Sequence, residues 1–345
     1  MTRTDKIRSF LEDGEGVIIT GYPNIFYYSG FASEDAVLVV TKDRQILATD
    51  SRYTVQAKQQ AADFEIYDIE NGLKKLFCGV NEKVFGFEEN IMTVSEMAIF
   101  QKLTKKLVPM SEKLNKPRRI KDSAELEKIA SAEKLASDAL LHTLPQIKVG
   151  MTEREVALMI EFYMLKNGAS KASFETIVAS GVRSSMPHGI ASDKIIETGD
   201  FVTMDFGCVL DGYCSDMTRT VVMGKASDRQ REIYGIVQKA QEEALNAIAA
   251  GKRCADIDKV ARDIIENAGY GKNFGHSLGH SVGIEIHEAP NFSPKSKDFA
   301  ESGNVITVEP GIYIEGFGGV RIEDVAVVGE KTQNLTDFTK ELIII

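Results

Sequence analysis

The chain has 345 residues, with 41 lysines and arginines against 51 aspartates and glutamates and a formal net charge of −10. This acidic balance and the lack of a basic stripe argue against a nucleic-acid partner. No apolar run reaches the length of a membrane span and no charged-then-apolar leader opens the chain, so we expect a cytoplasmic protein without a membrane partner. The length exceeds the usual size of one domain and predicts two.

Residues 1–110 alternate short strand-like runs with helical patterns. The basic run KLNKPRRIKD at 113–122 marks the expected boundary between a domain of residues 1–115 and one of residues 116–345. We expect this run to be a solvated connector. Asp122 and Glu125 have the spacing of a capping box, which predicts that a long amphipathic helix follows.

The second domain contains two similar segments, GMTEREVALMIEFYMLKNGA from residue 150 and GKRCADIDKVARDIIENAGY from residue 251. Helical periodicity alone could produce the similarity. A duplicated α/β unit is the alternative, and it would place helices on one face of a curved sheet and leave the other face for a site.

A β-hairpin is predicted in FVTMDFGCVLDGYCSDMTRTVVM, residues 201–223, because Asp211-Gly212 is typical of a two-residue turn. Such a turn pairs Gly207 with Asp216 and points Asp205 to the same face as Asp216. The two carboxylates are then diagonal neighbours, about 7–8 Å apart at the backbone. A loop longer by one residue would put them on opposite faces.

A second hairpin is predicted in residues 304–328, where a glycine-rich tip separates two alternating apolar runs. A loop spanning residues 314–318 places Glu309 opposite Glu323, whereas a four-residue loop would separate their faces. Pro310 cannot donate to a ladder and predicts a bulge or an edge. Either glutamate alone would be read more simply as half of an ion pair.

Three of the five histidines, His276, His280 and His287, fall in residues 274–290 between the two hairpins. One imidazole among four carboxylates favours a first-row transition metal over magnesium or calcium. A ligand role for His280 or His287, with a proton or hydrogen-bond role for the other, is more economical than two ligands. His276 is interpreted as structural.

Carboxylates gathered on one core repel each other and are costly to bury, and divalent cations between them remove both problems. The sequence therefore predicts a hydrolase with a two-metal centre. The four cysteines, Cys78, Cys208, Cys214 and Cys254, form no CxxC pair and are predicted to be reduced and buried.

The order Asp, Asp, His, Glu, Glu in the words MDFG, SDMTRT, HSLGH, TVEPGIY and VRIED, together with HEAP, resembles the metallopeptidases of the pita-bread fold. That family includes methionine aminopeptidase, aminopeptidase P, prolidase and creatinase. The resemblance implies an α/β (α+β) protein with a C-terminal pita-bread domain and a smaller N-terminal creatinase-like α/β domain. It also implies two metal ions, with Asp216 and Glu323 bridging them, and the ligands Asp205, Asp216, His280, Glu309 and Glu323.

The same resemblance implies roles for other residues. His188 in SSMPHG and His287 in HEAP are expected to contact the substrate and stabilise the transition state, and Glu309 to pass a proton from water to the leaving nitrogen. Arg321 is expected to orient acidic groups, although a plain ion pair would look the same in the sequence. Manganese is the expected metal, with cobalt, zinc or iron as alternatives, and the protein is expected to be a homodimer.

The length before residue 116 and the stretch YPNIFYYSGF at 22–31 resemble aminopeptidase P and prolidase more than methionine aminopeptidase. We therefore expect a peptidase that hydrolyses the Xaa-Pro bond at the N-terminus of peptides, as aminopeptidase P does. The alternative is an Xaa-Pro dipeptidase, or prolidase, and a remoter one is a non-catalytic peptide-binding relative. The complete ligand set disfavours both that relative and a creatinase-like activity on amidino compounds.

Two positions depart from the family pattern. Ser281 follows His280, where a glycine is common, and Asn291 stands where many prolidases have an arginine. An arginine there can hold a dipeptide's carboxylate in a planar bidentate contact, so Asn291 weakens the dipeptidase interpretation. Arg52 or Arg321 could serve instead.

Overall fold

The computed structural model describes residues 2–345. The chain forms two compact units, Met1–Arg118 and Arg119–Ile345. The predicted domain boundary after residue 115 stays a prediction. No helix in residues 2–345 is both long and apolar enough to cross a membrane.

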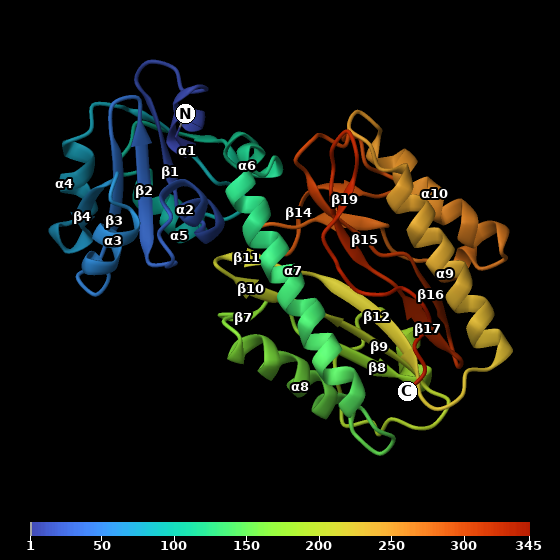
Figure 1. The fold of residues 1–345 in the computed structure, drawn as a ribbon. Coiled ribbons are helices and arrows are strands. Elements are labelled where there is room, and N and C mark those ends of the chain that lie inside the picture. Colours follow the sequence, from blue (N-terminus) through green and yellow to red (C-terminus); the bar gives the residue numbers. More distant parts are fainter. Residues whose placement is uncertain (1) are drawn as a thin grey trace. The chain divides into compact units, whose positions relative to one another are not determined.

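The first unit is built on a six-stranded sheet in the order β4-β3-β2-β1-β5-β6 (Figure 1). The outer pairs β3–β4, β1–β5 and β5–β6 are parallel, and β1–β2 and β2–β3 are antiparallel. The strands are β1 (Glu15–Ile19), β2 (Ala36–Thr41), β3 (Gln45–Thr49), β4 (Glu65–Asp68), β5 (Val84–Phe87) and β6 (Lys106–Pro109). The helices are α1 (Arg3–Arg8), α2 (Tyr22–Ser29), α3 (Thr54–Gln60), η1 (Ile69–Asn71), α4 (Leu73–Cys78), α5 (Val94–Phe100) and α6 (Ser111–Arg119).

The second unit contains four long helices and several small sheets, in the orders β11-β10-β7, β12-β9-β8, β14-β13-β15-β18-β19 and β16-β17. Its helices are α7 (Ser123–Thr143), η2 (Leu144–Gln146), α8 (Glu153–Lys166), η3 (Gly181–Ser185), α9 (Asp228–Ala247), α10 (Cys254–Asn267) and η4 (Gly271–Asn273). Its strands are β7 (Lys171–Ala172), β8 (Ile177–Ser180), β9 (Phe201–Phe206), β10 (Cys208–Leu210), β11 (Tyr213–Cys214), β12 (Met217–Val222), β13 (Gly279–Ser281), β14 (Glu288–Phe292), β15 (Val305–Val308), β16 (Gly311–Ile314), β17 (Gly318–Arg321), β18 (Asp324–Val327) and β19 (Gln333–Asn334).

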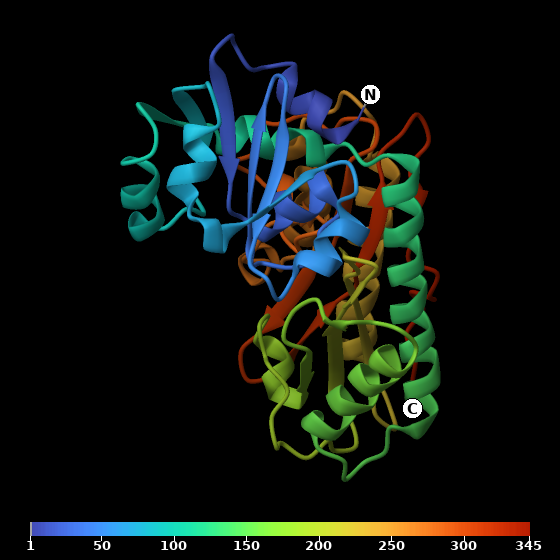
Figure 2. The same cartoon turned by 90° about the vertical axis from the view of Figure 1, so that its left-hand side faces the viewer.

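The capping box predicted at Asp122 is confirmed and starts α7. The Glu125 backbone N–H donates to Asp122 Oδ1 at 2.9 Å, and the Asp122 N–H donates to Glu125 Oε2 at 3.0 Å. From this cap, α7 runs beside α8 and packs on β10, β11 and β12 (Figure 2). The helix pair α7–α8 thereby covers the strands in the first half of the second unit.

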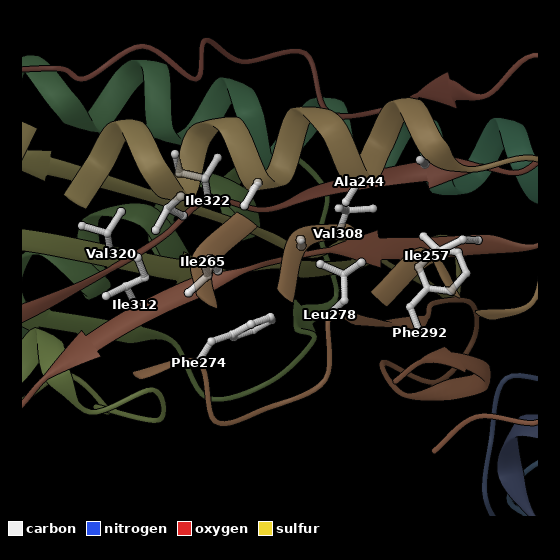
Figure 3. Packing of buried hydrophobic residues seen from close by; sticks show 14 of the residues in the cluster. Ala244, Ile257, Ile265, Phe274, Leu278, Phe292, Val308, Ile312, Val320 and Ile322 are labelled. Atoms are coloured by element: carbon white, nitrogen blue, oxygen red, sulfur yellow. The ribbon is translucent and has the colours of Figure 1, made fainter. Parts of the chain in front are cut away.

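The two similar segments form α8 and α10, as predicted, and α10 packs beside α9. Figure 3 shows the core beneath the second helix pair, where Ala244 and Ile257 meet the strand residue Val308 and its neighbours. The helix pair α9–α10 therefore covers the strands of the C-terminal half, as α7–α8 covers the preceding ones.

Alternation along the strands separates the helix-covered core from the opposite face. Met204 and Phe206 of β9 pack in the core that includes α7 and α8, so Asp205 between them points the other way. Ile306 and Val308 of β15 likewise pack in the core that includes α9 and α10. The face away from the helices is thus the one that receives the acidic residues.

The register predicted for the first hairpin is confirmed. Leu210 pairs with Tyr213, and Thr218 lies opposite Asp205. The turn residues Asp211 and Gly212 have φ angles of 49° and 82°. Positive φ at both central positions defines the type I′ turn that Asp-Gly favours, and its twist matches that of the flanking strands.

The second hairpin also has the predicted register. Ile314 pairs with Gly318, Gly311 with Arg321, and Val308 with Asp324, which places Glu309 opposite Glu323. The ladder is interrupted at Pro310, between β15 and β16, but the register is the same on both sides. Pro310 therefore marks a break between strands and not a bulge, because its missing N–H removes one bond without adding a residue.

Two expectations about side-chain burial are wrong. The basic run at 113–122 is no solvated connector: α6 occupies most of it, and Lys121 is buried with its Nζ 3.1 Å from Glu288 Oε2. The partner lies 167 residues away, so the run itself gives no sign of the pairing. Three of the four free cysteines are buried as predicted, but Cys78 at the end of α4 is exposed.

Candidate metal centre

The second unit contains a cavity of about 490 Å³ on the strand face opposite the helices. All eight residues predicted for the site line it: Asp205, Asp216, His280, Glu309, Glu323, His188, His287 and Arg321. The residues come from segments more than a hundred positions apart in the sequence. The fold therefore brings these residues to one cavity, whereas the sequence shows only the order in which they occur along the chain.

Each predicted ligand stands on or directly beside a strand. Asp205 lies in β9 and His280 in β13, whereas Asp216 links β11 to β12. Glu309 follows β15, and Glu323 lies between β17 and β18. Strand backbones are rigid, so they hold these side chains in place more firmly than loops would.

His280 is the histidine that reaches the carboxylates. Its Nε2 lies 3.5 Å from Asp216 Oδ2 and 3.4 Å from Glu309 Oε1. One donor atom from each of Asp216, His280 and Glu323 lies within 4.8 Å of the other two. A small cation fits among donor atoms at this spacing.

The electrostatics of the cluster are unfavourable without a cation. Burial, followed by repulsion from neighbouring carboxylates, holds the pKa values of Asp216 and Glu323 well above their usual range. Burial raises the pKa of Glu309 to about 8. Burial also lowers the pKa of His280 to about 4, which keeps its imidazole neutral and able to offer a lone pair. Divalent cations favour the charged carboxylates and the neutral imidazole alike.

The surroundings of the Asp205 carboxylate indicate whether these residues suit a metal ion. Its Oδ2 accepts a hydrogen bond of 2.6 Å from Arg321 Nη2, while its Oδ1 is buried and has no partner in residues 2–345. A buried acceptor without a partner is rare and costly, and a cation at that oxygen would satisfy it. Together with four carboxylates and one neutral imidazole, this unpaired oxygen fits divalent transition-metal ions.

Two threonines hold the glutamates. Thr218, opposite Asp205, donates from its hydroxyl to Glu323 Oε2 at 2.6 Å. Thr307 donates to Glu309 Oε1 at 3.1 Å and accepts from the His280 backbone N–H at 3.0 Å. These bonds hold one oxygen of each glutamate in place and so orient the two carboxylates.

Arg321 is more deeply engaged than the sequence predicts. Nε donates to the Thr218 hydroxyl at 3.0 Å, and Nη1 donates to the Tyr313 hydroxyl at 2.7 Å and to the Pro187 carbonyl at 3.3 Å. With the bond to Asp205, the guanidinium joins both hairpins to the loop that carries His188. Its side chain is 3% exposed, so it orients its neighbours from a buried position.

The remaining predicted histidines lie at the open side of the cavity. His188 and His287 are exposed, and both line the cavity. The His287 ring centroid lies 4.4 Å from that of His280. The two imidazoles can therefore meet a molecule bound beside the carboxylates, as general donors or acceptors of hydrogen bonds.

His276 and Tyr313 are functional candidates that sequence reasoning missed. His276 lines the cavity, and its Nε2 lies 2.9 Å from the hydroxyl that also accepts from Arg321. Burial lowers the pKa of His276 to about 4, so its ring is neutral. The four-residue spacing between His276 and His280 was the available signal, and the structural interpretation of His276 is too narrow.

Glu133 of α7 was also missed. Its Oε1 accepts the Asp216 backbone N–H at 2.7 Å, and its Oε2 accepts from the Thr336 hydroxyl at 3.1 Å. Burial raises the pKa of Glu133 to about 8. No local signal could have found it, since 83 residues separate it from Asp216.

Comparison with known proteins adds to this geometry. Residues 127–330 match the model of metallopeptidase family M24, and residues 3–120 match the creatinase/prolidase N-terminal domain. A protein of Pyrococcus horikoshii named Xaa-Pro dipeptidase is 38% identical over 99% of this chain and 98% of its own. The solved Xaa-Pro dipeptidase from Bacillus anthracis has a TM-score of 0.96 and 41% identity, covering 99% of each chain. The X-Pro aminopeptidase structure from Thermotoga maritima has a TM-score of 0.94 and 37% identity, covering 99% of this chain and 100% of its own.

Fold, site and matches define a metallopeptidase, an enzyme that hydrolyses peptides with the help of divalent metal. The chain belongs to metallopeptidase family M24, with a creatinase/prolidase N-terminal domain before the catalytic one. The resemblance read from the sequence is therefore confirmed, and so is the predicted architecture of a pita-bread domain preceded by a creatinase-like α/β domain.

Proposed function

We propose that this enzyme is an Xaa-Pro dipeptidase that hydrolyses the bond before proline in dipeptides. The observation that carries a hydrolytic role is the cluster of buried carboxylates around His280, with Asp205 Oδ1 unpaired within residues 2–345. The preference for dipeptides is supported by relatives named Xaa-Pro dipeptidase that match over nearly the whole chain. The sequence alone favoured aminopeptidase P, and the relatives favour its alternative.

An aminopeptidase acting on longer peptides is the second candidate. The similar X-Pro aminopeptidase structure supports it, and so does the asparagine at position 291 of the cavity wall. Within residues 2–345, Arg321 is the only lysine or arginine that lines this cavity, and its donors are directed at protein groups. In a dipeptidase the substrate carboxylate would therefore rely on other donors, namely the imidazoles of His188 and His287 and the Asn291 amide.

The proposal includes a two-metal centre. Manganese is the expected metal, with cobalt, zinc or iron as alternatives. The ligands would be Asp205, Asp216, His280, Glu309 and Glu323. Two divalent ions held there would lower the pKa of water toward neutrality and polarise the scissile carbonyl.

The protein's own groups would then move protons and hold the substrate. Glu309 is proposed to accept the proton of the attacking water and to deliver it to the proline nitrogen, which must be protonated to leave. His287 is proposed to donate to the carbonyl oxygen as its negative charge develops, with His188 as a second contact across the cavity. Arg321 would act through Asp205 and the Tyr313 hydroxyl by holding both in place. A cytoplasmic homodimer stays part of the proposal.

The test compares alanyl-proline with alanyl-proline amide, which differ only in the terminal carboxylate. Enzyme stripped with a chelator and reloaded with manganese should cleave the free dipeptide far faster than the amide, and the stripped enzyme should cleave neither. Faster cleavage of the amide and of alanyl-prolyl-alanine would support the aminopeptidase. No metal-dependent cleavage of any of the three would overturn the Xaa-Pro proposal.

A further inference from the structure

One carboxylate in the cavity has no part in the centre described above. Five acidic residues line the cavity, and four of them are the proposed ligands Asp205, Asp216, Glu309 and Glu323. The fifth is Glu175, whose side chain is exposed and forms no hydrogen bond or ion pair within residues 2–345. Since the proposed ions would balance the ligand carboxylates, Glu175 would keep its negative charge for whatever enters the cavity.

The place of Glu175 follows from the strand register. Ile177 in β8 lies opposite Asp205 and also bridges to Ile190. Glu175 precedes Ile177 by two residues, which corresponds to about 7 Å of extended chain. Glu175 thus lies in the chain segment just before β8, two residues from the neighbour of Asp205, and lines the same cavity.

Part of the cavity wall is apolar. Phe174, Ile177, Ile190 and Ile286 all line the cavity. A ligand group that follows this wall gains by burying aliphatic carbon, and one that ends near Glu175 gains by carrying positive charge. Lysine and arginine side chains combine a long aliphatic stem with a cationic tip.

The α-ammonium group of a peptide does not meet these two conditions. It stands one carbon atom from the scissile carbonyl and so must lie close to the proposed ligands, away from Glu175. In an Xaa-Pro dipeptide, a long side chain on the first residue is the group that can extend from the scissile bond along the apolar lining toward Glu175.

We propose that Glu175 is a specificity-determining residue that favours lysine or arginine as the residue before proline. This inference rests on the proposed function, because it concerns the first residue of an Xaa-Pro substrate. The contact would be exposed to solvent, so it would change kcat/KM by about two- to fivefold and weaken with rising salt concentration.

The test uses manganese-loaded, full-length enzyme with lysyl-proline and norleucyl-proline, whose first residues share the same stem and differ in charge. Glu175→Gln should lower the ratio of kcat/KM for lysyl-proline over norleucyl-proline by about two- to fivefold, and 0.5 M salt should do the same to the wild type. Glu175→Lys should lower that ratio further and should raise the rate on glutamyl-proline. Glu243→Gln is the matched control, because Glu243 is exposed on α9, outside the cavity. The substitution removes the same negative charge as Glu175→Gln.

The outcomes separate the two proposals. If the wild type cleaves both dipeptides but the ratio is the same in Glu175→Gln and Glu243→Gln, the function stands and the role of Glu175 is refuted. An equal loss on both dipeptides would likewise refute it, because the carboxylate would then act on a group that the substrates share. If the wild type cleaves neither dipeptide, the proposed function fails and this inference fails with it.

Discussion

The two oxygens of the Asp205 carboxylate have different surroundings, and Arg321 is the cause. Arg321 Nη2 donates to Oδ2 at 2.6 Å, whereas Oδ1 is buried and has no partner in the chain from residue 2 onward. The same guanidinium holds the Tyr313 hydroxyl at 2.7 Å. Arg321 thus fixes the orientation of a proposed ligand and turns its second oxygen toward the cavity.

Replacing this guanidinium should be strongly destabilising. Arg321→Met leaves Asp205 buried without its cation, and breaking a buried ion pair costs about 3–5 kcal/mol of unfolding free energy. Urea denaturation of the chelated protein would measure the loss. The control is Arg154→Met, whose pair with Asp193 is 56% and 82% exposed, so its loss should change stability little. Equal losses in the two variants would contradict the role given to Arg321.

Stability of the metal-free protein should fall as the pH rises. The Glu309 carboxyl, with a pKa of about 8 in the folded state against an ordinary value of 4.5, keeps its proton when folded and loses it when unfolded. Between these values the unfolded state binds fewer protons, so the unfolding free energy drops by about 1.4 kcal/mol per pH unit for such a group. Asp216 and Glu323, whose pKa values are also raised, add to the effect.

Thermal unfolding at pH 6 and pH 8, with and without manganese, tests this. The rise in Tm on adding metal should be larger at pH 8, because the cation then replaces protons that the carboxylates have lost. A metal-free Tm that is the same at both pH values would contradict the account.

How much of this site the sequence predicts depends on the range of the interactions. Asp211-Gly212 specifies its own turn, and the turn alone sets the register that puts Asp205 and Asp216 on one face. The second hairpin follows in the same way, so Glu309 and Glu323 were also correctly paired. Turn and register rules are therefore enough to predict which residues face each other within one hairpin.

Contacts between distant segments escaped prediction. Glu133 supports Asp216 from α7, and Lys121 is buried against Glu288, but neither pair has a signature in the residues around it. Their positions depend on how the helices pack on the strands, which hydrophobic periodicity does not fix. Charge alone favours exposure, so the basic run by itself predicts a solvated connector.

A buried carboxylate should help to hold the loop that carries His188. Glu153 at the start of α8 accepts from Ser180 N–H and hydroxyl at 2.7 and 2.9 Å, and from Ser192 N–H and hydroxyl at 3.1 and 2.6 Å. Glu153→Gln leaves several of these donors poorly satisfied and should speed hydrogen exchange throughout residues 181–192.

In kinetic assays Glu153→Gln should raise KM if His188 contacts the substrate. Glu155→Gln on the same helix is the control, since Glu155 only caps the helix with Thr152 and a glutamine can still close that capping box. Unchanged exchange in the loop of Glu153→Gln would show that other contacts are enough to hold it.

Gly207 should tolerate no side chain. It lies where the first hairpin closes beside Asp216, and a Cβ there would overlap the Ser215 carbonyl oxygen and the Ser173 hydroxyl. Gly207→Ala must displace backbone atoms, so we expect the unfolding free energy to fall by at least about 1–3 kcal/mol. Metal binding should also become weaker. Gly235→Ala in α9 meets no atom within 4 Å and should be stabilising by about 0.5–1 kcal/mol. A neutral Gly207→Ala would contradict the close approach.

A manganese titration of chelator-stripped enzyme would show whether four carboxylates and His280 hold two catalytic metal ions. Bound metal and alanyl-proline hydrolysis would be followed together in the wild type, in Asp216→Asn and in the control Asp211→Asn, whose exposed turn position suits asparagine. We predict two bound ions per chain, no hydrolysis before metal is added, and the loss of both binding and activity in Asp216→Asn alone. One ion or none per chain, or full activity in Asp216→Asn, would contradict the account.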